Sequence, residues 1–514
     1  MSFAKPRLSF WQIINMNVGF FGIQYSFGLQ QSAVNPIYDF LGAAPDEIPW
    51  LNLAGPLTGL LVQPIIGALS DRTWHPRFGR RKPYFFIGAI MCSIALFLFP
   101  FSSALWMAAG LLWILDAGNN TAMEPYRAFV ADKLDSSQQA TGFQAQSFFT
   151  GFGQTLANFS LLLFPLIIVG KTGKLPNWVF ASFFLGAVCS ITSVWWSMKT
   201  TPEIPPSPQE LKALKATPLN VFSPFVDVAS AIGSMPRVLW LLALVYLFQW
   251  YALFCYWQNS SKAVAQNAFG WQHQQLSAAQ DTIVNQYEAF KKSVKTYLAD
   301  NELDAAAETK NDTTALATYT HWSGRVAVNA PLSVANLQAI ERIDANNRKY
   351  ENAVSATGGI NGWYNIVTFL IAFALVGFAK RWGAKYVHFI CLLLAGVGFL
   401  VFSQVHAIPL FYIAITGFGV GWASMMGIPY LMVVGQIPKE KYGVYMGIIN
   451  MMIVIPMLLQ TLTFGYVLRN FLHNDPTKAI VFAGVLLLLA ALATLLIPYQ
   501  KLAASQSANM AAAH

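Results

Sequence analysis

Two acids and one arginine interrupt an apolar stretch, residues 105–131, that is long enough to cross a membrane as a helix. At about 100° per residue, four polar side chains of this stretch fall within ~80° of one another: Asp116, Asn120, Glu124 and Arg127. A charge at the bilayer centre costs roughly 2.5–3.5 kcal/mol on insertion scales, so this one-sided stripe must face protein or water. The stripe therefore indicates a path for a proton or a solute.

Each member of the stripe also has a structural interpretation. Asp116 is either a proton-binding carboxyl group or a structural acid that stays neutral or paired. Glu124 and Arg127 lie three residues apart, and we expect them to form a charge-neutralised pair near the inner mouth that takes part in gating, with direct contact to a sugar as the alternative. Asn120 either binds a solute or bridges two helices.

The composition bounds the class of protein. Of 514 residues, 55% are hydrophobic and 11% are charged, whereas a soluble domain carries about 25% charged residues. The chain is therefore an all-α membrane protein that crosses the bilayer many times. The net charge of +9 comes from basic residues in short connections, which sets orientation and predicts no nucleic-acid partner. The four cysteines lie in apolar stretches, so we expect no disulfide framework and no metal site.

Apolar stretches of spanning length occur twelve times, six on each side of residues 199–236. The basic residues of the connections gather on one side, and the connections after the first, third and ninth spans hold no Lys or Arg. This asymmetry predicts cytoplasmic termini. The spans are 11–34, 48–70, 84–103, 105–131, 142–169, 177–198, 237–259, 358–379, 386–405, 408–434, 442–468 and 479–499.

Two segments interrupt the series of spans. Residues 199–236 are proline-rich and then amphipathic, which predicts a cytoplasmic linker between an N-terminal half (1–198) and a C-terminal half (237–514). Residues 260–357 form an extracytoplasmic insertion between spans 7 and 8. Its aromatic residues favour a small folded cap, with a flexible loop or a partner-binding module as alternatives.

An internal repeat relates the two halves. Pro125-Tyr126 of the fourth span corresponds to Pro429-Tyr430 of the tenth. Two parallel six-helix halves are typical of the major facilitator architecture, whose binding site lies at the midplane between the halves. The connection after the second span carries a charged motif that either orients the protein or gates it by locking helix ends together: Asp71, Arg72, Arg80 and Arg81.

Several motifs together resemble the sucrose transporters of plants and animals, within the glycoside–pentoside–hexuronide cation symporters of the major facilitator superfamily. They are Gly22-Ile23-Gln24-Tyr25, Gly55-Pro56-Leu57-Thr58-Gly59, Arg77-Phe78-Gly79-Arg80-Arg81-Lys82-Pro83 and Leu115-Asp116-Ala117-Gly118-Asn119-Asn120. The resemblance covers the first five spans strongly and spans 10 and 11 moderately. It implies that Asp116 is the proton-binding carboxylate. The insertion departs from the family pattern, and so does the eighth span, where Gly359 to Tyr364 stand in place of an arginine.

A sugar site needs amides for hydroxyl groups and aromatic faces for pyranose rings. The candidates, each of which could instead pack helices together, are Gln24, Tyr25, Gln31, Asn120, Gln154, Gln249, Trp250, Trp363 and Asn450. Tyr256 and Trp257 lie near the end of a predicted span, which favours a place in the interfacial aromatic belt. We expect no acid or base to be buried in the second half and assign no role to any histidine.

These observations predict a monomeric carrier in a lipid bilayer that imports a disaccharide of the sucrose or maltose kind together with protons. The alternatives are a sodium-coupled carrier, a facilitative carrier and a sugar sensor that does not transport. No nucleotide-binding motif or catalytic constellation occurs, so we expect neither an enzyme nor a cofactor. The lack of a long tail and the unusual insertion favour a bacterial inner membrane.

Overall fold

A computed structural model describes residues 7–498, apart from 135, 206–225, 227–231, 234, 275, 304–307, 310–311, 313, 327–330 and 434–441. Most of the predicted linker 199–236 thus lies outside the described residues. The chain divides into two compact units, which we call the membrane unit (Met1–Ala268 and Val354–His514) and the insertion unit (Phe269–Ala353).

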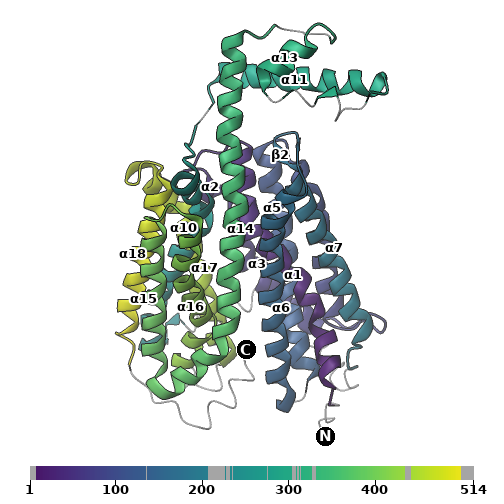
Figure 1. The fold of residues 1–514 in the computed structure, drawn as a ribbon. Coiled ribbons are helices and arrows are strands. Elements are labelled where there is room, and N and C mark those ends of the chain that lie inside the picture. The colour runs from purple at the N-terminus through teal and green to yellow at the C-terminus, as the bar shows by residue number, and fades with distance from the viewer. Residues whose placement is uncertain are drawn as a thin grey trace. The chain divides into compact units, whose positions relative to one another are not determined.

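The described chain is almost entirely helical (Figure 1). Two short 3₁₀ turns, Phe99–Phe101 and Phe164–Leu166, follow the fourth and sixth helices. A two-stranded hairpin, β1 (Lys171–Thr172) and β2 (Leu175–Pro176), precedes the seventh helix. The helices are α1 (Phe10–Phe40), α2 (Ile48–Leu51), α3 (Ala54–Arg72), α4 (Lys82–Leu98), α5 (Leu105–Lys133), α6 (Ser136–Leu163), α7 (Asn177–Thr200), α10 (Arg237–Phe269), α11 (Ala278–Asp300), α13 (Ala315–Trp322), α14 (Val334–Trp382), α15 (Ala384–Phe402), α16 (Ile408–Val433), α17 (Tyr442–Asn470) and α18 (Pro476–Thr494).

Local sequence explains several helix ends. Ser9 caps α1 through a capping box with Gln12, which satisfies two backbone donors at the start of the helix. Asp475 caps α18 by accepting from the backbone N–H groups of Thr477 and Lys478. Helix α14 runs unbroken from Val334 to Trp382 because this segment contains no proline.

Each of the twelve predicted spans corresponds to a helix of the membrane unit, so the prediction of two six-helix halves is confirmed. In Figure 1, α1 and α3–α7 form one group, and α10 and α15–α18 form another. Eight of the described helical segments are long and apolar enough to cross a membrane. The other four predicted spans are α1, α5, α6 and α14, and these more polar helices carry Asp116 and most of the buried amides described below, whereas Gln249 lies on α10.

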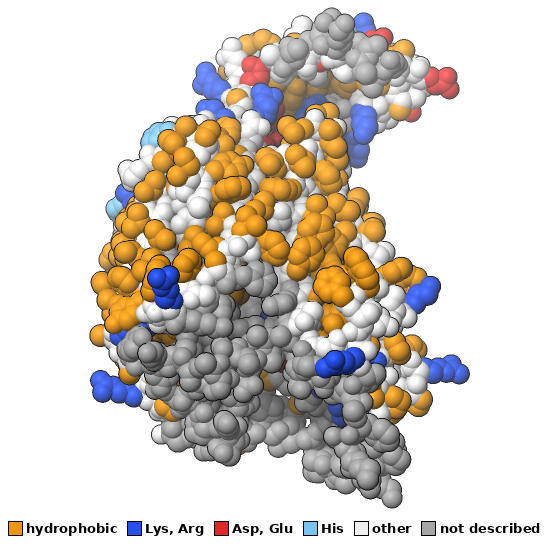
Figure 2. Space-filling model, turned by 60° about the horizontal axis from the view of Figure 1, so that its bottom comes forward, with side chains coloured by type: hydrophobic (Ala, Val, Ile, Leu, Met, Phe, Trp, Pro, Cys, Tyr) orange, Lys and Arg blue, Asp and Glu red, His pale blue; other side chains and the backbone are white. Residues whose placement is uncertain are grey.

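The membrane unit exposes much of its apolar surface. Trp106 is 77% exposed and Ile413 is 70% exposed, and Figure 2 shows hydrophobic side chains spread over the helices on the face drawn. Exposed apolar surface of this extent suits contact with lipid. The chain is therefore a multi-pass membrane protein.

The insertion unit has a hydrophobic core of its own. Side chains of α11, α13 and α14 meet in it, among them Tyr287, Phe290, Trp322, Leu337 and Ile340. Trp322 is fully buried, and its Nε1 donates to the carboxylate of Asp312 at 2.5 Å. A buried indole with a satisfied N–H is typical of a folded domain.

Candidate functional site

Asp116 is buried inside the first half, with 1% of its surface exposed. Its Oδ1 accepts from the Nε2 of Gln30 on α1 at 2.7 Å, and the Oε1 of Gln30 accepts from the Nδ2 of Asn119 at 3.4 Å. No described residue hydrogen-bonds to the other carboxylate oxygen, Oδ2. The carboxyl group therefore has a fixed position, one free oxygen and no cationic partner among the described residues.

Asn120 lies one turn from Asp116 and ties α5 to α3. Its Oδ1 accepts from the Nε2 of Gln63 at 2.6 Å, and its Nδ2 donates to the Oγ1 of Thr58 at 3.0 Å and to the carbonyl of Asp116 at 2.9 Å. The sequence allows Asn120 either to bind a solute or to bridge two helices, and in the structure it bridges two helices. Gln63 and Thr58 are not among the candidate site residues predicted from the sequence.

The expected pair between Glu124 and Arg127 is absent from the described contacts, so this prediction is wrong. Arg127 is exposed and Glu124 is half-buried, with Gly67 of α3 beside the Glu124 side chain. The physical reason is that Tyr126 and Phe129 take the packed face of this turn. Arg127 is thereby directed away from the protein interior.

The charged motif between α3 and α4 locks helix ends of the first half together. Arg81 binds Asp132 at 2.9 Å and donates to the Oγ of Ser70 at 2.7 Å, which joins the start of α4 to the ends of α5 and α3. The carboxylate of Glu203 accepts from the backbone N–H groups of residues 80, 81 and 82 at 2.7–3.0 Å. A carboxylate at a helix N-terminus is stabilised there. The side chains of Asp71 and Arg72 lie outside the described ones, and no described residue pairs with the Arg80 side chain.

A chain of buried hydrogen bonds crosses from the first half to the second. Ser32 of α1 donates to the Oδ1 of Asn158 on α6 at 2.5 Å and accepts from the Nδ2 of Asn361 on α14 at 3.0 Å. The Oδ1 of Asn361 accepts from the hydroxyl group of Tyr256 on α10 at 2.7 Å. Nearby on the same two helices of the first half, Gln154 donates to Gln24 at 2.9 Å. Predicted Gln24 and Gln154 are thus brought together.

Three tryptophans meet in the second half beside an unsatisfied amide. The Trp422 ring lies edge-on to Trp250 and Trp257, with centroids 5.8 Å and 5.7 Å apart. No described residue hydrogen-bonds to the indole nitrogens of Trp250 and Trp257 or to either amide atom of Gln249, which is fully buried. We call Gln249, Trp250, Trp257 and Trp422 the tryptophan cluster. Unsatisfied buried donors beside aromatic faces are what a polyhydroxylated ligand would bind.

The interpretation of Tyr256 and Trp257 as an interfacial belt is wrong. Tyr256 is fully buried and stacks on Phe399 at 4.6 Å, and Trp257 is 9% exposed. Helix α10 continues to Phe269, ten residues beyond the predicted end at residue 259. Both aromatic residues therefore lie inside the helix, away from its end.

Four predicted sugar ligands lie apart from these clusters. Tyr25 is buried where α1 packs on Gly186 of α7. Trp363 is 38% exposed and donates to Thr416 at 2.9 Å, so it lies on the outer side of α14. Gln31 is half-buried and Asn450 is exposed, and no contact ties either to Asp116 or to the tryptophan cluster.

The second half does contain buried ionisable residues, contrary to expectation. Lys262 lies in the extended part of α10 and forms an ion pair with Asp39 at 2.8 Å. His388 is fully buried in α15, where its Nδ1 lies 2.8 Å from the hydroxyl group of Ser424. From the sequence, Lys262 is expected in the insertion, because the span that starts at residue 237 is predicted to end at 259, ten residues before the end of α10. His388 is expected at the end of a span, and there α15 starts two residues earlier than predicted.

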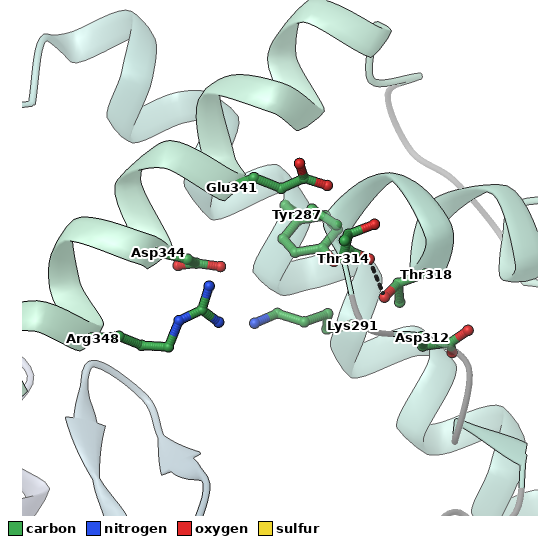
Figure 3. A pocket seen from close by; sticks show the side chains of 9 residues that line it. Tyr287, Lys291, Asp312, Thr314, Thr318, Glu341, Asp344 and Arg348 are labelled. Atoms are coloured by element: carbon green, nitrogen blue, oxygen red, sulfur yellow. Dashed lines mark hydrogen bonds between the residues drawn. The ribbon is translucent and has the colours of Figure 1, made fainter.

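The insertion unit holds a polar cavity of about 330 Å³. In Figure 3, the charged ends of Lys291 and Arg348 point into the same space. Several of its polar groups are engaged within the unit: Glu341 accepts from the N–H of Leu316 at 3.0 Å, and Lys291 pairs with Glu288 at 2.6 Å. Burial raises the pKa of Tyr287 to about 12, so this phenol stays neutral. We interpret the cavity as the polar flank of the core of the insertion unit.

A comparison with family profiles identifies the family of the chain. The sequence profile described as Major Facilitator Superfamily matches residues 16–280, more than half of the chain. A sucrose transport protein (SUT5) of Oryza sativa subsp. indica is 24% identical over 299 residues, which is 51% of this chain and 53% of that protein. The general alpha-glucoside permease of Schizosaccharomyces pombe is 27% identical over 269 residues, 48% of this chain and 47% of that protein.

The chain thus spans about half the length of these curated relatives. Among solved structures, the nucleoside transporter NupG covers 95% of this chain with a TM-score of 0.61 and 11% identity, and 98% of NupG is covered. The D-xylose-proton symporter covers 95% with a TM-score of 0.54 and 13% identity, and 98% of it is covered. At these identities the structures support the fold alone.

Proposed function

Because the chain belongs to the major facilitator superfamily and is a sucrose-transporter-like member of it, we propose that it is a proton-coupled symporter that imports a disaccharide. The single observation that carries the coupling is the buried carboxyl group of Asp116, which has a free oxygen and no cationic partner among the described residues. Intramembrane acids of this kind are functional by default. The named relatives support the sugar as cargo.

The proposed cycle uses one ionisable group in the first half and sugar contacts in both. Asp116 takes up a proton at Oδ2 from the outer side while Gln30 holds Oδ1. The sugar then binds between the halves, with its apolar ring faces on the tryptophan cluster and its hydroxyl groups on the amide of Gln249. The halves rock about this midplane site, and the sugar and the proton leave on the inner side.

The proposal places residues 1–198 and 237–514 as the two halves, joined by the linker 199–236, with both termini in the cytoplasm and residues 260–357 outside. A bacterial inner membrane fits the short connections. The chain acts as a monomer, because each half supplies part of the site. Sucrose and maltose-type glucosides are the favoured cargo.

The direct test is uptake of radiolabelled sucrose, maltose and melibiose into proteoliposomes that hold the purified chain. With an inward proton gradient we expect at least one disaccharide to accumulate, and an uncoupler should abolish the accumulation. Uptake that an uncoupler leaves unchanged would show a facilitative carrier, and uptake driven by sodium would assign the coupling to sodium. Binding without flux would identify a sensor.

Gln249 offers a test of the sugar site. Replacing it with Leu keeps the volume and removes a buried amide that no described residue satisfies, and an unsatisfied buried polar group costs about 1–3 kcal/mol. We therefore expect Gln249→Leu to raise the melting temperature of the purified protein and to weaken sugar binding at least ~10-fold, as expected for one lost hydrogen-bonding group.

Thermal unfolding and equilibrium binding of the labelled sugar measure the two effects. Leu253, one turn further along α10 and fully buried, supplies the control, because Leu253→Met conserves volume and should leave both quantities near the parent values. A Gln249→Leu protein that is destabilised and binds sugar normally would show that the amide only supports packing.

A further inference from the structure

One face of α1 contacts the second half at three successive positions. Ser32 accepts from Asn361, Asn35 donates to the carbonyl of Trp257 at 3.3 Å, and Asp39 pairs with Lys262. The spacings of three and four residues place these side chains on one stripe of the helix. The last contact lies at the distal end of the membrane unit, which we define as the end where α1 and α10 finish.

The last contact differs from the others because both partners are charged and buried. The Nζ of Lys262 lies 2.8 Å from the Oδ1 of Asp39, and the side chains are 3% and 7% exposed. Removing one partner of a buried pair leaves an uncompensated charge away from water, which is strongly unfavourable. Either charge alone therefore favours any conformation that returns it to water.

A second ion pair joins the two halves at the distal end, and it is more exposed to solvent than the first. Arg469 of α17 lies 3.8 Å from Asp46, in the connection after α1, and their side chains are 71% and 23% exposed. Ion pairs in contact with solvent contribute little. Of the two pairs, only the one between Asp39 and Lys262 has the burial needed to bias a conformational equilibrium.

We infer that Asp39 and Lys262 form a latch that holds the distal ends of the two halves together and separates whenever the distal side opens. This inference rests on the proposed transport function, because a cycle between two open states requires every contact at the distal end to break. The two residues are positioning residues: they set the population of the distally closed state and do not touch the sugar or the proton of Asp116.

The latch predicts opposite results for single and double neutralisation. Asp39→Asn removes the counter-charge that the ammonium group of Lys262 has when the distal side is closed, and Lys262→Met removes the cation that lies 2.8 Å from Asp39. Each single variant should shift the equilibrium toward the distally open state by about a hundredfold or more. The double variant carries neither charge, so the closed state should regain its population.

The measurement is a distance between spin labels on the two halves in the full chain. Trp50 on α2 is 52% exposed and Phe471 after α17 is 66% exposed, so Trp50→Cys and Phe471→Cys provide labelling sites, with the label on the unmodified chain as background. We expect a longer distance to dominate in each single variant and the parent distance to return in the double variant. Uptake should fall at least tenfold in the single variants and recover in the double variant.

The exposed pair is the matched control: Asp46→Asn and Arg469→Gln should leave the distance distribution and the uptake at parent values. If a single variant does not reach the membrane folded, the exchange of charges, Asp39→Lys with Lys262→Asp, tests the same pair and should restore the closed distance. Parent distances in the single variants, or a double variant as open as the single ones, would overturn the latch. Because the distances need no sugar, a shift without uptake of any disaccharide would support the latch and count against the proposed cargo.

Discussion

Replacing Asp116 with Asn is expected to abolish sugar accumulation driven by a proton gradient while sugar exchange across the membrane persists. The amide keeps the shape of the side chain, and its Oδ1 still accepts from Gln30, but it binds no proton in this pH range. With one proton per sugar and a gradient of one pH unit, the parent protein should concentrate sugar about tenfold, because each tenfold ratio corresponds to ~1.4 kcal/mol. The variant should stop at equal concentrations.

Counterflow and gradient-driven uptake in the same proteoliposomes separate these two activities. Glu47 is the control, because it is an exposed acid in the connection before α2, and Glu47→Gln should accumulate sugar like the parent protein. Accumulation that persists in Asp116→Asn would place the coupling group elsewhere. His388 and the pair of Asp39 and Lys262 would then be the next groups to test, since their side chains are also buried in the membrane unit.

The fold was predictable because apolar length and the charges of connections are local properties. Each predicted span has its helix, and the polar stripe placed Asp116 and Asn120 correctly on a buried face. Helix ends were less predictable. The span that begins at residue 237 is predicted to end at 259, because polar residues begin there. In the structure these polar residues are all buried: Asn259, Ser260, Ser261 and Lys262. Lys262 pairs with Asp39 of α1, a contact that the local hydropathy of α10 does not report.

The partners of the site residues were harder to predict for the same reason. Gln30 was visible in the sequence, but only the packing of α1 against α5 brings its amide to Asp116. Tyr256 and Trp257 were assigned to the membrane interface because the helix was thought to end beside them. A single error in a helix end thus hid both the latch and the place of Trp257 in the tryptophan cluster.

Helix α14 must approach α6 closely at the distal end, and this contact tests alternating access by shape alone. A Cβ atom at Gly358 would lie 2.8 Å from the carbonyl oxygen of Asn158 and 2.9 Å from the Cβ of Leu161. The Asn158 oxygen belongs to the backbone of a helix, so it cannot move aside without moving α6. Gly358→Leu can therefore relieve the overlap by keeping the two helices apart, which leaves the distal side open.

We expect Gly358→Leu to fold and to reduce sugar uptake at least tenfold, because a closed state destabilised by ~1.4 kcal/mol or more is populated tenfold less. Gly358→Ala should have a smaller effect in the same direction. Gly377 on the same helix is the control: among the described residues, no atom outside its own stretch of helix lies within 4 Å of a Cβ atom there, so Gly377→Leu should transport normally and gain helix propensity. The spin-label distance between positions 50 and 471 should lengthen only in the Gly358 variants.

Equal losses at Gly358 and Gly377 would show that the helix tolerates no larger side chain for reasons unrelated to closure. Normal uptake by Gly358→Leu would show that α14 and α6 do not need this contact during transport. Because the substitution adds no charge and leaves Asp39, Lys262 and Asp116 in place, it separates the shape of the closed state from its electrostatics. A distally open Gly358→Leu protein that keeps its ability to bind sugar from the distal side would show that the two halves, not the binding residues, limit the cycle.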